Sequence, residues 1–288
     1  MSAARLLYWS VKRELWENRS IYLAPLAVAA MMLFGLLISM LWLPQRVRGL
    51  SALTPAKQHE LVSMPYNAVG GLMVMTAFIV GVFYCIDALY GERRDRSILF
   101  WKSMPVSDRT TVLAKASIPL VVLPLLILPV ILGTQLIVLL FSSVILMLNG
   151  ISVATQWQHL PLIQMTVALL YCLPAIALWH APVYAWLLLV SAWSRRAVFL
   201  WALLPQIVIS VFEKAAFGTS NFAEYLQYRF WGWFPLSFDF SASGSIRRPV
   251  TVMTPGDFLS TPGLWGGLLF AALFLALAVR LRRNREPI

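Results

Sequence analysis

Charged residues are scarce in this sequence. Only 12% of the 288 residues are Asp, Glu, Lys or Arg, whereas 60% are hydrophobic; a soluble domain has about 25% charged and roughly 45–50% apolar residues. This composition excludes a soluble globular protein. The charges favour one sign, with 23 Lys and Arg against 12 Asp and Glu and a formal net charge of +11. A nucleic-acid-binding protein is also excluded, because it needs a polar surface that displays its basic patch.

Recognisable catalytic and metal-binding patterns are missing as well. The two cysteines, Cys85 and Cys172, lie inside apolar runs, so their spacing supports neither a disulfide framework nor a zinc site. His59, His159 and His180 are isolated in the sequence, and each is expected to be a structural or interface residue rather than a metal ligand. No Gly-x-x-x-x-Gly-Lys-Ser/Thr phosphate loop occurs, so the chain cannot hydrolyse ATP by that mechanism. We expect no metal, no cofactor and no enzymatic activity in the chain itself.

Long stretches without any charge are the strongest positive signal. An ionised side chain at mid-bilayer costs at least about 2.5–3.5 kcal/mol, and a helical span needs about 20 mostly apolar residues. The longest charge-free stretch, 116–194, is too long for one crossing and is divided by a polar segment at 149–159. We therefore predict an all-α polytopic membrane protein, a single transmembrane domain over residues 1–288 with six transmembrane helices at about 21–42, 69–89, 118–148, 161–193, 198–217 and 264–279.

The basic residues indicate which way the spans face. When the connecting segments are assigned alternately to two sides, sixteen Lys and Arg residues fall on the side of both termini and seven on the other. The positive-inside rule therefore predicts that both termini lie in the cytoplasm. The first span is too long for the core of a signal peptide, and we expect it to stay as an uncleaved anchor.

The first twenty residues predict an amphipathic helix at the membrane interface. Leu7, Val11 and Leu15 recur at i, i+4 and i+8, Tyr8 lies beside them, and basic residues flank the stripe. Such a helix lies along the membrane surface with its cations near the lipid headgroups. The alternative is an ordinary juxtamembrane extension of the first span.

The segment 90–116 after the second span carries the most informative pattern. It predicts a short helix with a charged first half and a consecutive apolar run at 98–101. On a helix this run points in all directions, so part of it needs another surface, either on a partner or beneath the protein's own bundle. Pro105 ends the element, Ser107 is placed to cap the next helix, and Asp108 is favourable in the first turn of that helix.

Two segments resemble a known family of membrane proteins. The loop from Glu92 has the form Glu-Arg-Arg-x-x-Ser-Ile-Leu-x-x-x-Ser-x-Pro-Val-Ser, and the Thr-Pro-Gly-Leu-Trp segment at 261–265 enters a last span that is closed by Arg280, Arg282 and Arg283. With the N-terminal helix and six spans, this layout resembles the membrane subunits of ABC-type exporters of the type-2 permease family. In that family the first segment is a connecting helix, and the loop supplies a coupling helix that docks into a groove on a separate ATPase subunit.

The resemblance implies a site, partners and a location. The implied partners are an ABC ATPase subunit, which binds ATP and magnesium, and a second permease subunit in a homodimer or heterodimer within membrane lipid; nucleic acid is not among them. The implied location is a bacterial inner membrane. Charge reversal at Arg93, Arg94 and Arg96, or the change Trp101→Ala, is expected to uncouple ATP hydrolysis from transport without unfolding the spans. The coupling residues implied are Glu92, Arg93, Arg94, Asp95, Arg96, Ser97, Ile98, Leu99, Phe100, Trp101, Lys102 and Ser103.

The segment between the fifth and sixth spans, about 218–261, is unusually aromatic. So many aromatic residues predict short interfacial or re-entrant helices rather than a free loop. In the family this position forms an outer gate over the conduit, which implicates Phe230, Trp231, Trp233 and Phe234; the alternative is that the aromatics lie on the outer leaflet. The full set is Phe222, Tyr225, Tyr228, Phe230, Trp231, Trp233, Phe234, Phe238 and Phe240.

The sequence therefore favours the permease subunit of an ATP-driven exporter. No Asp, Glu, Lys or Arg lies near the centre of a span, which argues against proton- or ion-coupled transport and suits an amphipathic cargo such as a lipid, a peptide or a drug-like molecule. The alternative function is a membrane scaffold or assembly factor that binds another protein through the same loop and transports nothing. A membrane-bound enzyme is least favoured, because no catalytic constellation is recognisable.

Overall fold

The computed structural model describes residues 3–50, 54–103, 106–154, 157, 160, 162–238 and 253–284. Within these residues the chain is helical, apart from connecting turns and one isolated antiparallel bridge between Phe238 and Met253. Six helical segments are long and apolar enough to cross a membrane, which confirms the prediction of an all-α protein with six spans. These segments are Ser20–Gly49, Lys57–Arg94, Asp108–Leu148, Leu162–Trp193, Val198–Phe217 and Pro262–Asn284.

The helices extend beyond several predicted span ends. α2 (Ser20–Ser39) continues through a 3-10 turn, η1 (Met40–Trp42), into α3 (Leu43–Leu50). α4 (Pro55–Ala88) begins well before the predicted start at Val69. Thr54 is extended before it and Pro55 occupies the first turn, where the missing N–H of a proline needs no partner. A charge-free window therefore measures an apolar stretch, whereas the helix around it can continue into charged residues.

Proline shapes the third span. This span comprises α7 (Asp108–Ser117), a π-helical segment η2 (Ile118–Val122) and α8 (Leu123–Leu148). Pro119 lies in η2, where its missing N–H and its ring disturb the regular i to i−4 ladder and favour a wider turn. The wider turn lies at a close crossing: a Cβ added to Gly81 on α4 would lie 3.2 Å from Pro119 Cβ.

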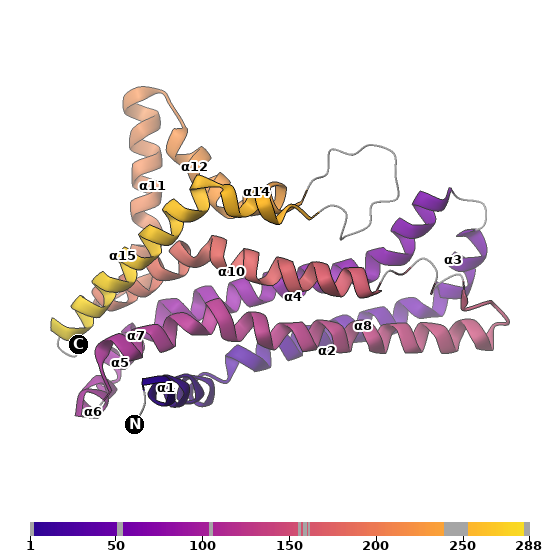
Figure 1. Ribbon diagram of the computed structural model, residues 1–288, viewed down its shortest axis with the longest axis horizontal. Helices are drawn as coiled ribbons and strands as arrows, with labels where there is room; N and C mark the ends of the chain where they lie inside the picture. The colour runs from indigo at the N-terminus through magenta and orange to yellow at the C-terminus, as the bar shows by residue number, and fades with distance from the viewer. Residues whose placement is uncertain are drawn as a thin grey trace.

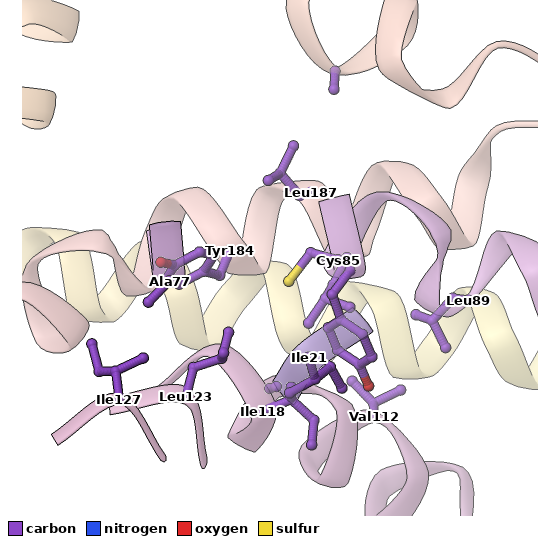
Figure 2. Close-up of a cluster of buried hydrophobic side chains, with 14 of the residues drawn as sticks. Ile21, Ala77, Cys85, Leu89, Val112, Ile118, Leu123, Ile127, Tyr184 and Leu187 are labelled. Carbon is purple, nitrogen blue, oxygen red and sulfur yellow. The ribbon is translucent and has the colours of Figure 1, made fainter. Parts of the chain in front are cut away.

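The main buried cluster forms where α2, α4, η2, α8 and α10 (Leu162–Trp193) meet (Figures 1 and 2). Ile21, Cys85 and Leu123 are buried there beside Leu187 of α10. Cys85 and Cys172 are both free thiols. Because lipid tails are as apolar as leucine, close packing rather than hydrophobic burial holds such helices together. Gly81 contributes to that packing, since a side chain at this position would meet Tyr184 Cε1 of α10 at 3.0 Å.

After α10, the next helix stands apart from this bundle, whereas the later described helices cover one side of it. α11 (Val198–Phe217) stands away from it at the upper left of Figure 1, and its buried residues are Val198 and Ala202. Gly218, with φ +68°, ends the helix in the left-handed conformation that glycine adopts most readily. α12 (Asn221–Trp231), α13 (Trp233–Ser237) and α14 (Pro255–Ser260) follow, and α15 (Pro262–Asn284) returns along α10.

Candidate functional site

The candidate site is the end of the bundle at which both chain termini lie, called the terminal end below. α1 (Ala3–Glu17), α5 (Tyr90–Arg94) and α6 (Ser97–Ser103) gather there with the last turn of α15 (Figure 1). α7 packs against both α1 and α15. Segments from the beginning, the middle and the end of the chain therefore surround the loop that the sequence singled out.

This loop forms two short helices, whereas the sequence predicted one. α5 ends at Arg94, and α6 begins at Ser97. Between them Arg96 has a left-handed backbone with φ +56°, a conformation that costs a side-chain-bearing residue roughly 1–2 kcal/mol and interrupts a right-handed helix. Ser97 Oγ donates a hydrogen bond to the Glu92 carbonyl at 3.3 Å across the break. No glycine or asparagine at position 96 signals this break in the sequence.

The predicted N-cap of the helix that leads into the third span is confirmed. Ser107 is extended, with φ −71° and ψ 149°, and its Oγ accepts a hydrogen bond from the Thr110 N–H at 3.1 Å. Asp108 occupies the first turn of α7, near the positive end of the helix dipole. Pro105, which was predicted to end the preceding element, lies outside the described residues.

The predicted coupling residues separate into a buried set and an exposed set. Glu92, Arg93 and Ile98 are buried, whereas Ser97 and Trp101 are half-buried. The side chain of Lys102 lies outside the described part of the structure. Leu99 and Phe100 are 58% and 60% exposed. The exposed residues, called the docking face below, are Arg94, Asp95, Arg96, Leu99, Phe100 and Ser103.

Arg93 holds α5 against the end of α10. Its Nη2 donates hydrogen bonds to the Ser191 carbonyl at 3.1 Å and to the Ser194 carbonyl. The Ser191 hydroxyl in turn accepts from the backbone N–H groups of Leu89 and Tyr90, at 3.1 and 2.9 Å. A cation is favourable at these C-terminal carbonyls. The expectation that charge reversal at Arg93 would leave the spans folded is therefore revised, because this guanidinium is a buried structural group.

A group of six acidic and basic side chains, four of them buried and two half-buried, joins the surrounding helices, and we call it the ionic cluster. It contains three cations and three anions from α1, α5, α7 and α15. The members are Arg13, Glu14, Glu92, Asp108, Lys115 and Arg282.

Glu14 on α1 is one centre of the ionic cluster, and its side chain is fully buried. Arg13 Nη2 lies 2.6 Å and Lys115 Nζ 3.0 Å from its Oε1. The Tyr84 hydroxyl of α4 donates to its Oε2 at 2.8 Å. Burial alone would raise the pKa of Glu14, but the attraction of Lys115 and Arg13 outweighs burial and holds the pKa below its ordinary value.

Glu92 on α5 is the other centre. Lys115 Nζ lies 3.1 Å from Glu92 Oε1, and Arg282 Nη2 lies 3.1 Å from Glu92 Oε2. Arg13 Nη2 is 3.5 Å away, and Arg282 also forms an ion pair with Asp108. Lys115 therefore bridges α1 to α5, and Arg282 connects the end of α15 to α5 and α7. Removing Lys115 would leave the buried Glu14 and Glu92 with one cation fewer, and breaking a buried pair costs about 3–5 kcal/mol.

Trp101 connects α6 to the ionic cluster. The Arg13 guanidinium lies 4.0 Å from the centroid of the Trp101 ring, within cation–π range. Ile98 on the same helix is buried. One side of α6 is thereby anchored, while its other side carries the exposed Leu99 and Phe100. A displacement of α6 would act on Arg13 directly.

Sequence reasoning missed the ionic cluster. It counted Lys115 and Arg282 among the basic residues that orient the spans, quoted Arg282 also for the family resemblance, and did not single out Glu14. The partners are too far apart for spacing to reveal, since Glu14 and Lys115 are separated by 101 positions and Glu92 and Arg282 by 190. One local signal was present: Glu14 precedes Leu15, so it places a carboxylate beside the apolar stripe of an amphipathic helix.

The predicted apolar stripe on α1 is partly packed against the bundle and partly exposed. Val11 and Leu15 pack against the main buried cluster, whereas Leu7 and Tyr8 are exposed. The ammonium of Lys12 lies over the rings of Trp9 and Trp16, at 4.9 and 5.0 Å from their centroids. The placement of α1 along a membrane surface stays a prediction.

The four predicted gate residues lie around one cavity at the other side of the bundle. Phe230 and Trp231 end α12, and Trp233 and Phe234 begin α13, so the aromatic segment contains short helices as expected. All four line a cavity of about 830 Å³ together with residues of α4 and α10. Phe240 lies outside the described residues.

Arg229 is a second buried cation that the sequence did not single out. Its Nη1 donates to the Gly263 carbonyl at 3.0 Å, and its guanidinium lies 4.7 Å from the centroid of the Trp179 ring. The Trp179 Nε1–H donates to the Arg229 carbonyl at 2.8 Å. A Cβ added to Gly267 would overlap the Arg229 guanidinium at Nη2, so glycine on α15 makes room for this side chain. Arg229 thereby ties α12 to α10 and α15.

Comparisons with known proteins identify no relative: no protein-family model, no curated protein and no solved structure matches this chain. Within the described residues, no three His, Cys, Asp or Glu side chains gather in a way that could hold a metal ion. Among the described residues, the features that bear on function are the two-sided α6, the ionic cluster and the cavity.

Proposed function

We propose that this chain is the transmembrane permease subunit of an ATP-driven exporter of the ABC type, and that α6 docks onto a separate ATPase subunit. The observation that carries the proposal is the contrast between the two sides of α6. Ile98 is buried and Trp101 stacks on Arg13, whereas Leu99 and Phe100 are exposed. Two adjacent large apolar side chains on a short, anchored helix favour a binding role, because a partner surface would remove them from water.

The ionic cluster supplies the route by which docking would affect the spans. Movement of α6 would act on Arg13 through Trp101 and on Glu92 through the short connection to α5. Glu92 is paired with Lys115 on α7 and Arg282 on α15, so both of these spans would be displaced with it. Rigid-body movement of packed helices is a common way in which a local displacement changes access to a pathway.

The remaining parts of the proposal concern the partners and the membrane. The terminal end faces the cytoplasm, because the positive-inside rule assigns it the excess of basic residues. The ATPase subunit binds ATP and magnesium there, since this chain has no phosphate loop. A second permease subunit completes the pathway in a bacterial inner membrane, as the family resemblance implies.

A membrane scaffold is the alternative, because the same docking face would serve a partner that hydrolyses nothing. The discriminating experiment is to purify the full chain with its bound partners, identify these by mass spectrometry, and reconstitute them in vesicles. The proposal expects an ATPase subunit with a phosphate-binding loop. It also expects Phe100→Ser to reduce both co-purification and the ATP hydrolysis stimulated by the chain.

Tyr8→Ser is the matched control, because Tyr8 is an exposed aromatic residue at the same end of the molecule. We expect this variant to behave like the unaltered chain. Co-purification of an ATPase that Phe100→Ser leaves unchanged would refute the role of α6. A stable partner without a phosphate-binding loop would favour the scaffold.

A further inference from the structure

The cavity between the spans and the aromatic helices is large and elongated. Its volume is about 830 Å³, within the range of roughly 300–1,000 Å³ that is typical of small-molecule sites. Tyr66 and Phe78 of α4 both line it and are twelve residues apart, which corresponds to about 18 Å at about 1.5 Å per residue. α10 forms a second wall, and α12 and α13 close the aromatic side.

The wall is almost entirely apolar and, over the described residues that line it, contains no Asp, Glu, Lys or Arg. Two amide side chains, Asn67 of α4 and Gln135 of α8, lie at one end. Gln135 Nε2 donates to the Tyr66 carbonyl at 3.1 Å, which fixes its position. At the other end the buried His180 packs on Phe78, with ring centroids 4.9 Å apart. The polarity is thus concentrated at the end that the two amides form.

Two adjacent glycines open the cavity along α4. A Cβ added to Gly71 would meet no atom within 4 Å, and one added to Gly70 would meet only Leu169 Cδ2, at 3.7 Å. Two glycines inside a helix are unfavourable for the helix itself, since each increases the backbone entropy lost on folding. Their presence here leaves unfilled space beside the helix backbone. A ligand could therefore approach α4 closely.

We propose that this cavity binds a neutral amphiphile with a single alkyl chain. The chain lies against the aromatic wall, and an uncharged hydrogen-bonding head lies at Asn67 and Gln135. A charged head is disfavoured, because the described lining residues offer it no counter-ion and burial of an unpaired charge is unfavourable. A peptide is disfavoured too, since few polar groups are available for its backbone N–H and C=O groups. That this ligand is the exported cargo rests on the proposed function, whereas the binding itself does not.

Photolabelling of the full chain in phosphatidylcholine vesicles tests the binding. The probe is a monoacylglycerol with a diazirine on its chain, added as a trace fraction of the lipid, and the labelled residues are mapped by mass spectrometry. We expect adducts at cavity residues such as Met75 and Met165. In Gly71→Leu, whose added Cβ meets no atom within 4 Å and whose side chain occupies part of the cavity, these adducts should decrease by about tenfold.

Gly35→Leu is the matched control, because Gly35 is also an exposed helical glycine with nothing within 4 Å of an added Cβ, but it does not line the cavity. We expect its labelling to equal that of the unaltered chain. Asn67→Leu gives a second readout that needs no change at the glycines. It should weaken labelling by the monoacylglycerol and leave labelling by a diazirine alkane unchanged.

Three results would overturn the proposal. Adducts spread over the exposed faces of α2 and α11, with no effect of Gly71→Leu, would mean that the cavity holds only bulk lipid. Equal cavity labelling by an ionised fatty acid of the same chain length would refute a neutral head, and equal labelling by a diazirine phosphatidylcholine would refute a single chain. No ATPase subunit is needed, so failure here leaves the coupling proposal untouched, and failure of coupling leaves the binding result valid.

Discussion

Lys115 lies between two buried carboxylates, 3.0 Å from Glu14 and 3.1 Å from Glu92. Replacing it with methionine keeps most of the side-chain volume but leaves both carboxylates without this cation. We expect Lys115→Met to lower the free energy of unfolding by about 3–5 kcal/mol, as measured by denaturant titration of the purified chain in detergent. Arg94→Met is the control, because the Arg94 ion pairs with Asp87 and Asp95 are exposed and should contribute less than about 1 kcal/mol.

The double variant Lys115→Met with Glu14→Gln distinguishes a lost ion pair from poor packing of the methionine. It removes the cation and one of the anions together, so we expect a smaller loss than the sum of the two single changes. Additive losses would contradict the view that Lys115 stabilises the chain by pairing with Glu14.

Glu14 also predicts a dependence of stability on pH. Because its pKa in the folded chain lies below the ordinary value of 4.5, the unfolded chain binds this proton more readily. The stabilisation is therefore fully present above about pH 4.5 and is lost as the pH falls through the lower pKa of the folded state. We expect the free energy of unfolding of the unaltered chain to fall more steeply with decreasing pH than that of Glu14→Gln over this acidic range. The same pH dependence in both chains would exclude Glu14 as the group whose protonation destabilises the fold.

At the scale of elements, α5 and α6 have different roles although they belong to one loop. Arg93 binds the carbonyls at the end of α10, whereas Arg94 is exposed on the docking face. We expect Arg93→Glu to destabilise the chain and reduce its amount in the membrane. Arg94→Glu should leave the amount unchanged and weaken only the stimulation of the ATPase. The amount of each variant is measured in membranes, and its stimulation of the ATPase is measured in reconstituted vesicles. Equal results for the two variants would contradict the different roles of α5 and α6.

The sequence predicted the elements better than it predicted their contacts. Six spans and the Ser107 cap were predictable, because charge-free length and capping chemistry are local properties. The early start of α4 was missed, since a helix can continue into charged residues beyond its apolar window. The ion pair between Glu92 and Arg282 was unpredictable from spacing, because packing brings together residues 190 positions apart.

At the scale of the whole molecule, the described spans form a bundle with two distinct regions, the terminal end and the cavity. The terminal end has buried ions and a short helix with an exposed apolar pair, Leu99 and Phe100. The other place is the cavity between α4, α10 and the aromatic helices, which contains no Asp, Glu, Lys or Arg among its described lining residues. α10 connects the two regions, because Arg93 binds the carbonyls at its C-terminal end and other residues of α10 line the cavity.

The proposed contact between α6 and an ATPase subunit is tested directly by crosslinking from position 100. Both native cysteines lie within the spans, Cys85 buried and Cys172 half-buried, so Phe100→Cys introduces an accessible thiol at the docking face. Membranes that contain this variant are treated with a thiol-specific photocrosslinker, and the adduct is identified by mass spectrometry, with Tyr8→Cys as the control. If α6 docks onto an ATPase subunit, position 100 but not position 8 forms an adduct with a subunit that carries a phosphate-binding loop. An adduct with a protein that lacks this loop, or equal adducts from both positions, would contradict the proposed contact.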